Sequence, residues 1–83
     1  MEWPEWWEWE LEFTDHIEER MGDRGFSESE LRQMLEEAKG YRPNHVEGRY
    51  VIETALAGRE WEVVVEPDEL EQKLVLVTAY PTE

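Results

Sequence analysis

Apolar and acidic residues alternate without a break over residues 7–13, where two tryptophans, a leucine and a phenylalanine are separated by three glutamates. Side chains of an extended strand point alternately to its two faces, so a period of two predicts a strand here with one apolar face. Residues 1–6 precede this strand as a tryptophan-rich extension.

A helical hairpin is predicted over residues 14–40. Thr14 is placed to cap the first helix, because its side-chain oxygen can accept a hydrogen bond from an unpaired amide of the first turn. Ser27 and Glu30 have the spacing of a capping box for the second helix. Gly40 is expected to end that second helix, because glycine readily adopts the conformation that follows a helix C-terminus.

The period returns to two over residues 49–81, which predicts a meander of three strands. Gly58 and Arg59 suit a two-residue type II′ turn, in which glycine supplies the positive φ. This turn would set Leu56 opposite Trp61, so that apolar residues meet across the strand pair.

These elements follow one another as β-α-α-β-β-β. The pattern predicts an α+β fold in which the helical hairpin packs on a four-stranded, mostly antiparallel sheet, with residues 1–83 forming a single domain. Residues 74–80 are apolar on both faces, which favours a central strand. Residues 41–48 are expected to form a connection without regular structure.

Composition narrows the classes of function. The 83 residues include 8 Lys and Arg against 22 Asp and Glu, a formal charge of −14, which argues against a general nucleic-acid binder and against binding to anionic lipids. The chain has no cysteine, which excludes disulfides and thiolate chemistry. No apolar run is long enough for a membrane span and no signal peptide is visible, so we expect no membrane partner and a cytoplasmic location.

The cationic side chains are the main candidates for chemistry. His16, Arg20 and Arg24 recur every four residues and share one helix face. The one stretch with more bases than acids, residues 41–59, adds four more: Arg42, His45, Arg49 and Arg59. Together they could form an anion-binding cleft. Alternatively, they pair with nearby carboxylates or remain solvated.

Three aromatic residues also have two interpretations each. Tyr80, at the end of the last predicted strand, is either a site hydroxyl or a tyrosine that buries its ring and leaves its hydroxyl in water. Trp3 and Trp6 either fold over the edge of the core or stay exposed as anchors for a partner. Neither histidine has enough neighbouring ligands for a metal ion, so no metal or other cofactor is expected.

Several short motifs occur together in a characteristic order: FTDH at 13–16, ERM at 19–21, DRGFS at 23–27, EL at 30–31, GRY at 48–50 and VLVTAYP at 75–81. This series resembles a widespread bacterial family of domains of unknown function over about residues 13–81. The family in turn looks like a branch of the RelE/ParE-like small toxins, which share the β-α-α-β-β-β order.

The resemblance implies the toxin half of a type II toxin–antitoxin pair, whose antitoxin partner is of zinc-finger or helix-turn-helix type. It also implies metal-independent RNA cleavage, in which basic and tyrosine side chains align the 2′-hydroxyl and stabilise the scissile phosphate. The residues that match the family motifs and would carry this chemistry are His16, Arg20, Arg24, Arg49 and Tyr80.

A second hypothesis comes from the charge and the tryptophans. A chain at −14 with a cluster of tryptophans would suit a non-catalytic, acidic interaction module that binds a basic partner. A homodimer formed through the N-terminal strand is a further alternative, because an edge strand invites pairing.

Overall fold

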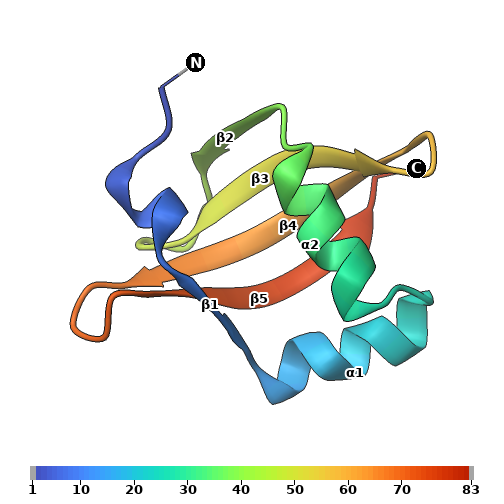
Figure 1. The fold of residues 1–83 in the computed structure, drawn as a ribbon, viewed down its shortest axis with the longest axis horizontal. Coiled ribbons are helices and arrows are strands. Elements are labelled where there is room, and N and C mark those ends of the chain that lie inside the picture. Colours follow the sequence, from blue (N-terminus) through green and yellow to red (C-terminus); the bar gives the residue numbers. More distant parts are fainter. Residues whose placement is uncertain (1, 83) are drawn as a thin grey trace.

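A five-stranded mixed sheet with two α-helices on one face makes up the described part of the chain, residues 2–82 of a computed structural model (Figure 1). In chain order its elements are a 3-10 helix η1 (Glu5–Glu8), β1 (Glu10–Phe13), α1 (Asp15–Arg24), α2 (Glu28–Glu36), β2 (Gly40–Pro43), β3 (Tyr50–Leu56), β4 (Arg59–Asp68) and β5 (Lys73–Pro81). The strands lie in the order β1-β5-β4-β3-β2, with β1 parallel to β5 and the other neighbours antiparallel. The predicted α+β class, with two helices packed on a sheet, is confirmed.

The fifth strand, β2, corrects the prediction of four strands and of an unstructured connection over residues 41–48. The second helix ends at Glu36, four residues before the expected stop at Gly40. The backbone amide of Lys39 then donates to the carbonyl of Glu53 at 2.7 Å, and the chain continues from Gly40 as a strand antiparallel to β3. Residues 40–43 therefore pair with the free edge of β3, although their composition is typical of a loop.

The N-terminal strand is shorter than the predicted 7–13, because residues 5–8 form η1 instead. The amide of Trp7 donates to the carbonyl of Pro4 at 3.0 Å, and that of Trp9 donates to Trp6 at 3.1 Å. From Glu10 the alternation behaves as predicted, with exposed glutamates and half-buried apolar residues taking turns along β1.

Both predicted helix caps are present. Thr14 Oγ1 accepts a hydrogen bond from the amide of Ile17 at 3.1 Å, which stabilises the first turn of α1. Ser27 and Glu30 form the capping box of α2, with reciprocal hydrogen bonds of 2.9 and 3.1 Å. Gly25 ends α1 in the left-handed conformation, at φ 69°, where a side chain would be strained.

The β3–β4 hairpin turns one residue earlier than predicted. Its turn is formed by Ala57 and Gly58, both at positive φ (53° and 80°), which is the signature of a type I′ rather than a type II′ turn. Leu56 therefore lies opposite Arg59, and Trp61 lies opposite Thr54. The shift in register is two residues, so every side chain stays on its predicted face.

The two faces of the sheet differ in what covers them. The helices lie on one face, where α1 packs along β5 and α2 packs on β3 (Figure 1). The core lies between them and includes Ile17, Phe26, Leu31, Met34, Ile52, Trp61, Val63, Val65, Leu74 and Leu76. We call the other side of the sheet the open face. Within residues 2–82, no helix is both long and apolar enough to cross a membrane.

Strand β5 is central, as predicted, since it lies between β1 and β4. Val64 pairs with Thr78 and Val65 pairs with Leu76, so Val77 is an extra residue at a register shift. This irregularity allows Leu76 and Ala79, three positions apart, both to be buried in the core.

Candidate functional site

Two of the predicted cationic residues, His16 and Arg49, line one pocket on the open face. The pocket has a volume of about 430 Å³, and Thr14, Glu66, Val75 and Val77 complete its lining. Its residues come from the start of α1, from the residue before β3, and from β4 and β5. The structure thus gathers an imidazole, a guanidinium and a carboxylate that are far apart in the sequence.

His16 is positioned by the cap of α1. Thr14 Oγ1 donates to the carbonyl oxygen of Leu76 at 3.0 Å and also accepts from an amide of the first helical turn. One side chain therefore caps α1 and ties its start to the central strand. The neighbouring strand residues Val75 and Val77 form the apolar part of the pocket beside the helix start.

Arg49 and Glu66 form the polar part of the pocket. Nε of Arg49 donates to Oε1 of Glu66 at 2.9 Å. Both side chains are well exposed, at 37% and 48% of their side-chain surface. An exposed ion pair of this kind contributes little to stability. The two groups are therefore accessible to a ligand that competes for either one.

Arg20 and Arg24 do not line this pocket. Arg20 forms an ion pair with Asp23 at 2.8 Å, one helical turn along α1. Nη1 of Arg24 lies 3.4 Å from the carbonyl oxygen of Ala79 in β5, to which it donates. Arg20 thus follows the alternative interpretation of pairing with a local carboxylate, and Arg24 bonds to the backbone of the sheet.

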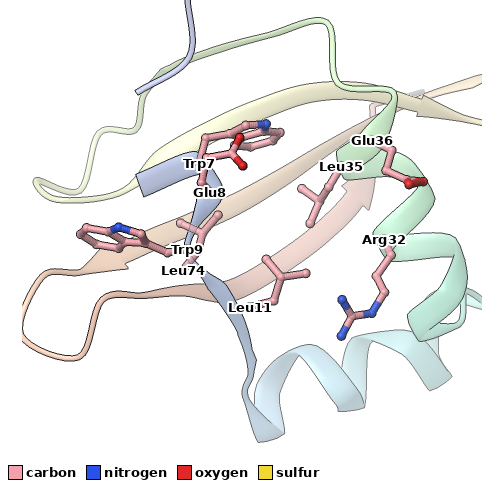
Figure 2. Close-up of a pocket in the computed structure, with 8 residues that line it drawn as sticks. All are labelled: Trp7, Glu8, Trp9, Leu11, Arg32, Leu35, Glu36 and Leu74. Atoms are coloured by element: carbon pink, nitrogen blue, oxygen red, sulfur yellow. The ribbon is translucent and has the colours of Figure 1, made fainter. Parts of the chain in front are cut away.

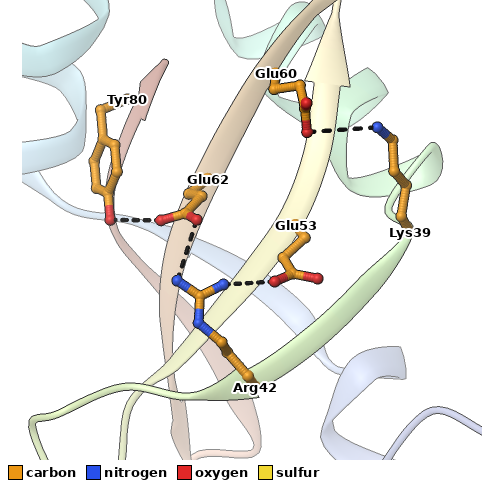
Figure 3. A network of polar contacts seen from close by, with 6 residues as sticks. All are labelled: Lys39, Arg42, Glu53, Glu60, Glu62 and Tyr80. Atoms are coloured by element: carbon orange, nitrogen blue, oxygen red, sulfur yellow. Dashed lines mark hydrogen bonds and ion pairs between the residues drawn. The ribbon is translucent and has the colours of Figure 1, made fainter. Parts of the chain in front are cut away.

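Tyr80 belongs to a separate network on the open face (Figure 3). Its hydroxyl donates to Oε1 of Glu62 at 3.0 Å, and Arg42 binds the other oxygen of Glu62 at 3.1 Å. The second arm of Arg42 reaches Glu53 at 2.6 Å. Close by, Lys39 lies 3.9 Å from Glu60.

The contacts of this network shift the pKa values of Tyr80 and Arg42. Burial, followed by the hydrogen bond to Glu62, raises the pKa of Tyr80, so its phenol keeps its proton and remains a donor. The hydrogen bond that Arg42 donates to Glu62 is the largest factor that raises the pKa of Arg42, and the hydrogen bond to Glu53 adds to it. With two carboxylates around one guanidinium, Arg42 is not available as an anion site.

His45 and Arg59 lie away from the pocket as well. His45 is exposed in the connection between β2 and β3, and Arg59 is exposed at the start of β4, next to the hairpin turn. The cationic residues predicted for one cleft therefore lie in several places, and the structure brings only His16 and Arg49 of the seven to this pocket. In the described part of the chain, no three histidine or carboxylate groups cluster as metal ligands.

The sequence profile of a family described as Domain of unknown function (DUF4258) matches residues 13–81. The chain belongs to this family. No curated protein and no solved structure matches the chain. All residues that line the pocket fall inside the matched segment, whereas the tryptophans at positions 3–9 precede it.

Those N-terminal tryptophans pack against the folded chain. Trp3 stacks on Trp7, with ring centroids 4.3 Å apart and planes inclined by 19°. Trp6 lies against Tyr50, with ring centroids 4.9 Å apart, and contacts Tyr41 edge-on at 5.7 Å. Of the two interpretations for Trp3 and Trp6, the structure shows the one in which they fold over the edge of the core.

Sequence reasoning missed Glu66 and Thr14 as parts of the pocket. The predicted register would have set Arg49 opposite Asp68, because it placed the turn one residue too late. The observed pairing of Tyr50 with Val65 brings Glu66 beside Arg49 instead. A turn at Ala57 and Gly58 would have indicated the correct register, but alanine gives little indication of positive φ.

Proposed function

We propose that this chain is the toxin component of a type II toxin–antitoxin pair and acts as a metal-independent ribonuclease. The observation that supports this proposal is the meeting of His16, Arg49 and Glu66 in one pocket. The resemblance to RelE/ParE-like toxins and the helices packed on one face of the sheet support the same assignment. The expected partner is an antitoxin of zinc-finger or helix-turn-helix type.

The imidazole, guanidinium and carboxylate of the pocket suit RNA cleavage without a metal, in which each would have one role. Glu66 would accept the proton of the ribose 2′-hydroxyl as its oxygen attacks the phosphorus atom. His16 would donate a proton to the departing 5′-oxygen, which leaves a 2′,3′-cyclic phosphate on one product. Arg49 would stabilise the negative charge that develops on the phosphate oxygens.

Because Arg49 and Glu66 are paired, the substrate would have to bind Arg49 before Glu66 can act as a base. A phosphate that binds the guanidinium competes with Glu66 for the same donors, since both are anions and the pair is exposed. Binding of the substrate would therefore release the carboxylate from its partner and let it act as a base. The N-terminus of α1, capped by Thr14 at the pocket, adds a positive partial charge on the same side.

The test is cleavage of single-stranded RNA in the presence of a metal chelator. We expect His16→Ala, Arg49→Gln and Glu66→Gln to lower the cleavage rate by about 100-fold or more, the usual size of a lost acid, base or charge-stabilising contact. The matched controls are His45→Ala and Arg20→Gln, which alter the same residue types outside the pocket and should retain activity. A folded wild-type protein that leaves RNA intact refutes the ribonuclease, as does retained activity in the three pocket variants.

The acidic interaction module remains the second candidate. It is favoured by the ion pairs of the open face, where Arg42, Arg49 and Lys39 all lie against carboxylates in a chain of net charge −14. This candidate predicts an inert protein that binds a basic partner, with an affinity that falls steeply as salt is added. For the homodimer alternative, β1 does lie at an edge of the sheet, but Glu10 and Glu12 are exposed on it and disfavour self-pairing.

A further inference from the structure

An apolar groove opens between the N-terminal segment and α2, on the face of the sheet that carries the helices (Figure 2). It has a volume of about 350 Å³, and its apolar lining consists of Trp7, Trp9, Leu11, Leu35 and Leu74. Trp7, Trp9 and Leu11 are only half-buried, so the folded chain leaves apolar surface uncovered at this place. Tryptophan at such a site is a common anchor for protein association.

The charged residues of the groove are mainly acidic. Glu8 and Glu36 are both exposed and line it from opposite sides, one from η1 and the other from α2 (Figure 2). Arg32 is the cation in the lining, but it is paired with Glu28 at 3.1 Å. Its guanidinium also lies 5.2 Å from the centre of the Phe13 ring. The charge of Arg32 is thus offset locally, and the groove presents apolar surface beside two carboxylates.

We propose that this groove binds a segment of a second protein that carries apolar anchor residues flanked by lysine or arginine. Charge complementarity determines this choice of occupant. A net charge of −14 disfavours nucleic acid, an anionic membrane and a second copy of the same chain, all of which it repels. A basic amphipathic segment would fill the apolar floor and pair with the acidic sides at the same time.

The groove is independent of the pocket proposed for RNA cleavage. Leu74 in the groove and Val75 in the pocket are neighbours on β5, and successive side chains of a strand point to opposite faces of the sheet. Trp7, Trp9 and Leu11 also precede the segment that matches the family. Binding here would therefore be a property of this chain that neither requires nor excludes catalysis.

The test is an NMR titration of the whole isotope-labelled protein with a designed peptide. The probe is a 16-residue peptide of leucine and lysine with the leucines at helical spacing, and a scrambled peptide of identical composition serves as its control. We expect saturable shifts in residues 7–11, in residues 32–36 and in the indole signals of Trp7 and Trp9. The scrambled peptide should bind more weakly.

Two charge-matched double variants separate the groove from general attraction. Glu8→Gln with Glu36→Gln should weaken binding by about fivefold, because each removes an exposed ion pair. Glu18→Gln with Glu19→Gln removes the same charge from the exposed side of α1 and should change the affinity less than twofold. All four positions are exposed, so the variants should keep the wild-type melting temperature.

The proposal is overturned if both double variants weaken binding equally, if the scrambled peptide binds as well, or if the shifts lie on the open face. It also fails if no saturable shift occurs at millimolar peptide. Concentration-dependent sedimentation without peptide, abolished by Leu11→Gln, would identify a second copy as the occupant instead.

Discussion

Removing the hydroxyl of Thr54 should destabilise the fold more than removing its methyl group. Thr54 lies in β3 with 2% of its surface exposed, and its Oγ1 donates to the carbonyl oxygen of Met34 at 2.5 Å. Met34 lies in the last turn of α2, where carbonyl groups lack an amide four residues ahead in the helix. This bond therefore joins the second helix to the sheet and satisfies a carbonyl that the helix itself leaves unpaired.

The expected magnitudes follow from this geometry. Thr54→Val keeps the shape of the side chain but leaves the carbonyl of Met34 buried without its donor, at a cost of about 2 kcal/mol. Thr54→Ser keeps the hydroxyl and loses one methyl group, at a cost of about 1 kcal/mol. In a domain of this size, a loss of 2 kcal/mol lowers the melting temperature by roughly 10 °C.

The assay is urea unfolding followed by tryptophan fluorescence at neutral pH. We expect the free energy of unfolding to decrease in the order wild type, Thr54→Ser, Thr54→Val, although valine is the more apolar replacement. If the valine variant equals or exceeds the serine variant in stability, the bond to Met34 does not contribute as argued, and burial of apolar surface alone governs this position.

Two further predictions concern the open face and the hairpin. The pKa of Tyr80 is raised above its ordinary value of 10.0, so the folded state holds the phenol proton more tightly than the unfolded state. The protonated phenol therefore contributes to the stability of the fold, and this contribution is lost as pH rises beyond about 10. Urea unfolding at pH 8 and pH 11 should therefore show a smaller loss of stability for Tyr80→Phe than for the wild type; an equal loss would contradict the raised pKa that burial of the phenol and its contact with Glu62 produce. Ala57→Asn should raise the free energy of unfolding by about 0.5 kcal/mol, because asparagine before glycine suits a type I′ turn, and a lower melting temperature would argue against that turn.

The sequence predicts best those features that depend on a few neighbouring residues. The capping box of Ser27 and Glu30 lies within one helical turn, so its partners are visible in the sequence itself. The core-facing residues of β3 and β4, such as Ile52 and Val63, were equally readable from the alternation, although Val51 and Val64 between them are buried as well. In the hairpin, both candidate turns leave the same residues on the same faces, so the pattern could not choose between registers.

Features that depend on distant partners could not be read from the sequence. Gly40 and Pro43 have the composition of a loop, and β2 exists because the edge of β3 offers unpaired backbone groups. Residues 7 and 8 alternate like a strand but belong to η1, where Trp6 packs on Tyr41 and Tyr50. The same holds for the pocket. The sequence indicated His16 as a candidate site residue, but the pairing of the strands determines which residues lie beside it.

The repulsion between RNA and a chain of net charge −14 acts over a longer distance than the contact that would hold a phosphate in the pocket. At physiological ionic strength, fields between exposed charges fade over about 8 Å, whereas a guanidinium holds a phosphate in direct contact. The acidic surface therefore slows the approach of RNA without removing the contact that Arg49 can make. The same surface speeds the approach of a basic protein, so a single charge distribution would disfavour the substrate and favour an inhibitory partner. Added salt would then act in opposite directions, since it relieves the repulsion of RNA while it weakens the capture of a basic antitoxin.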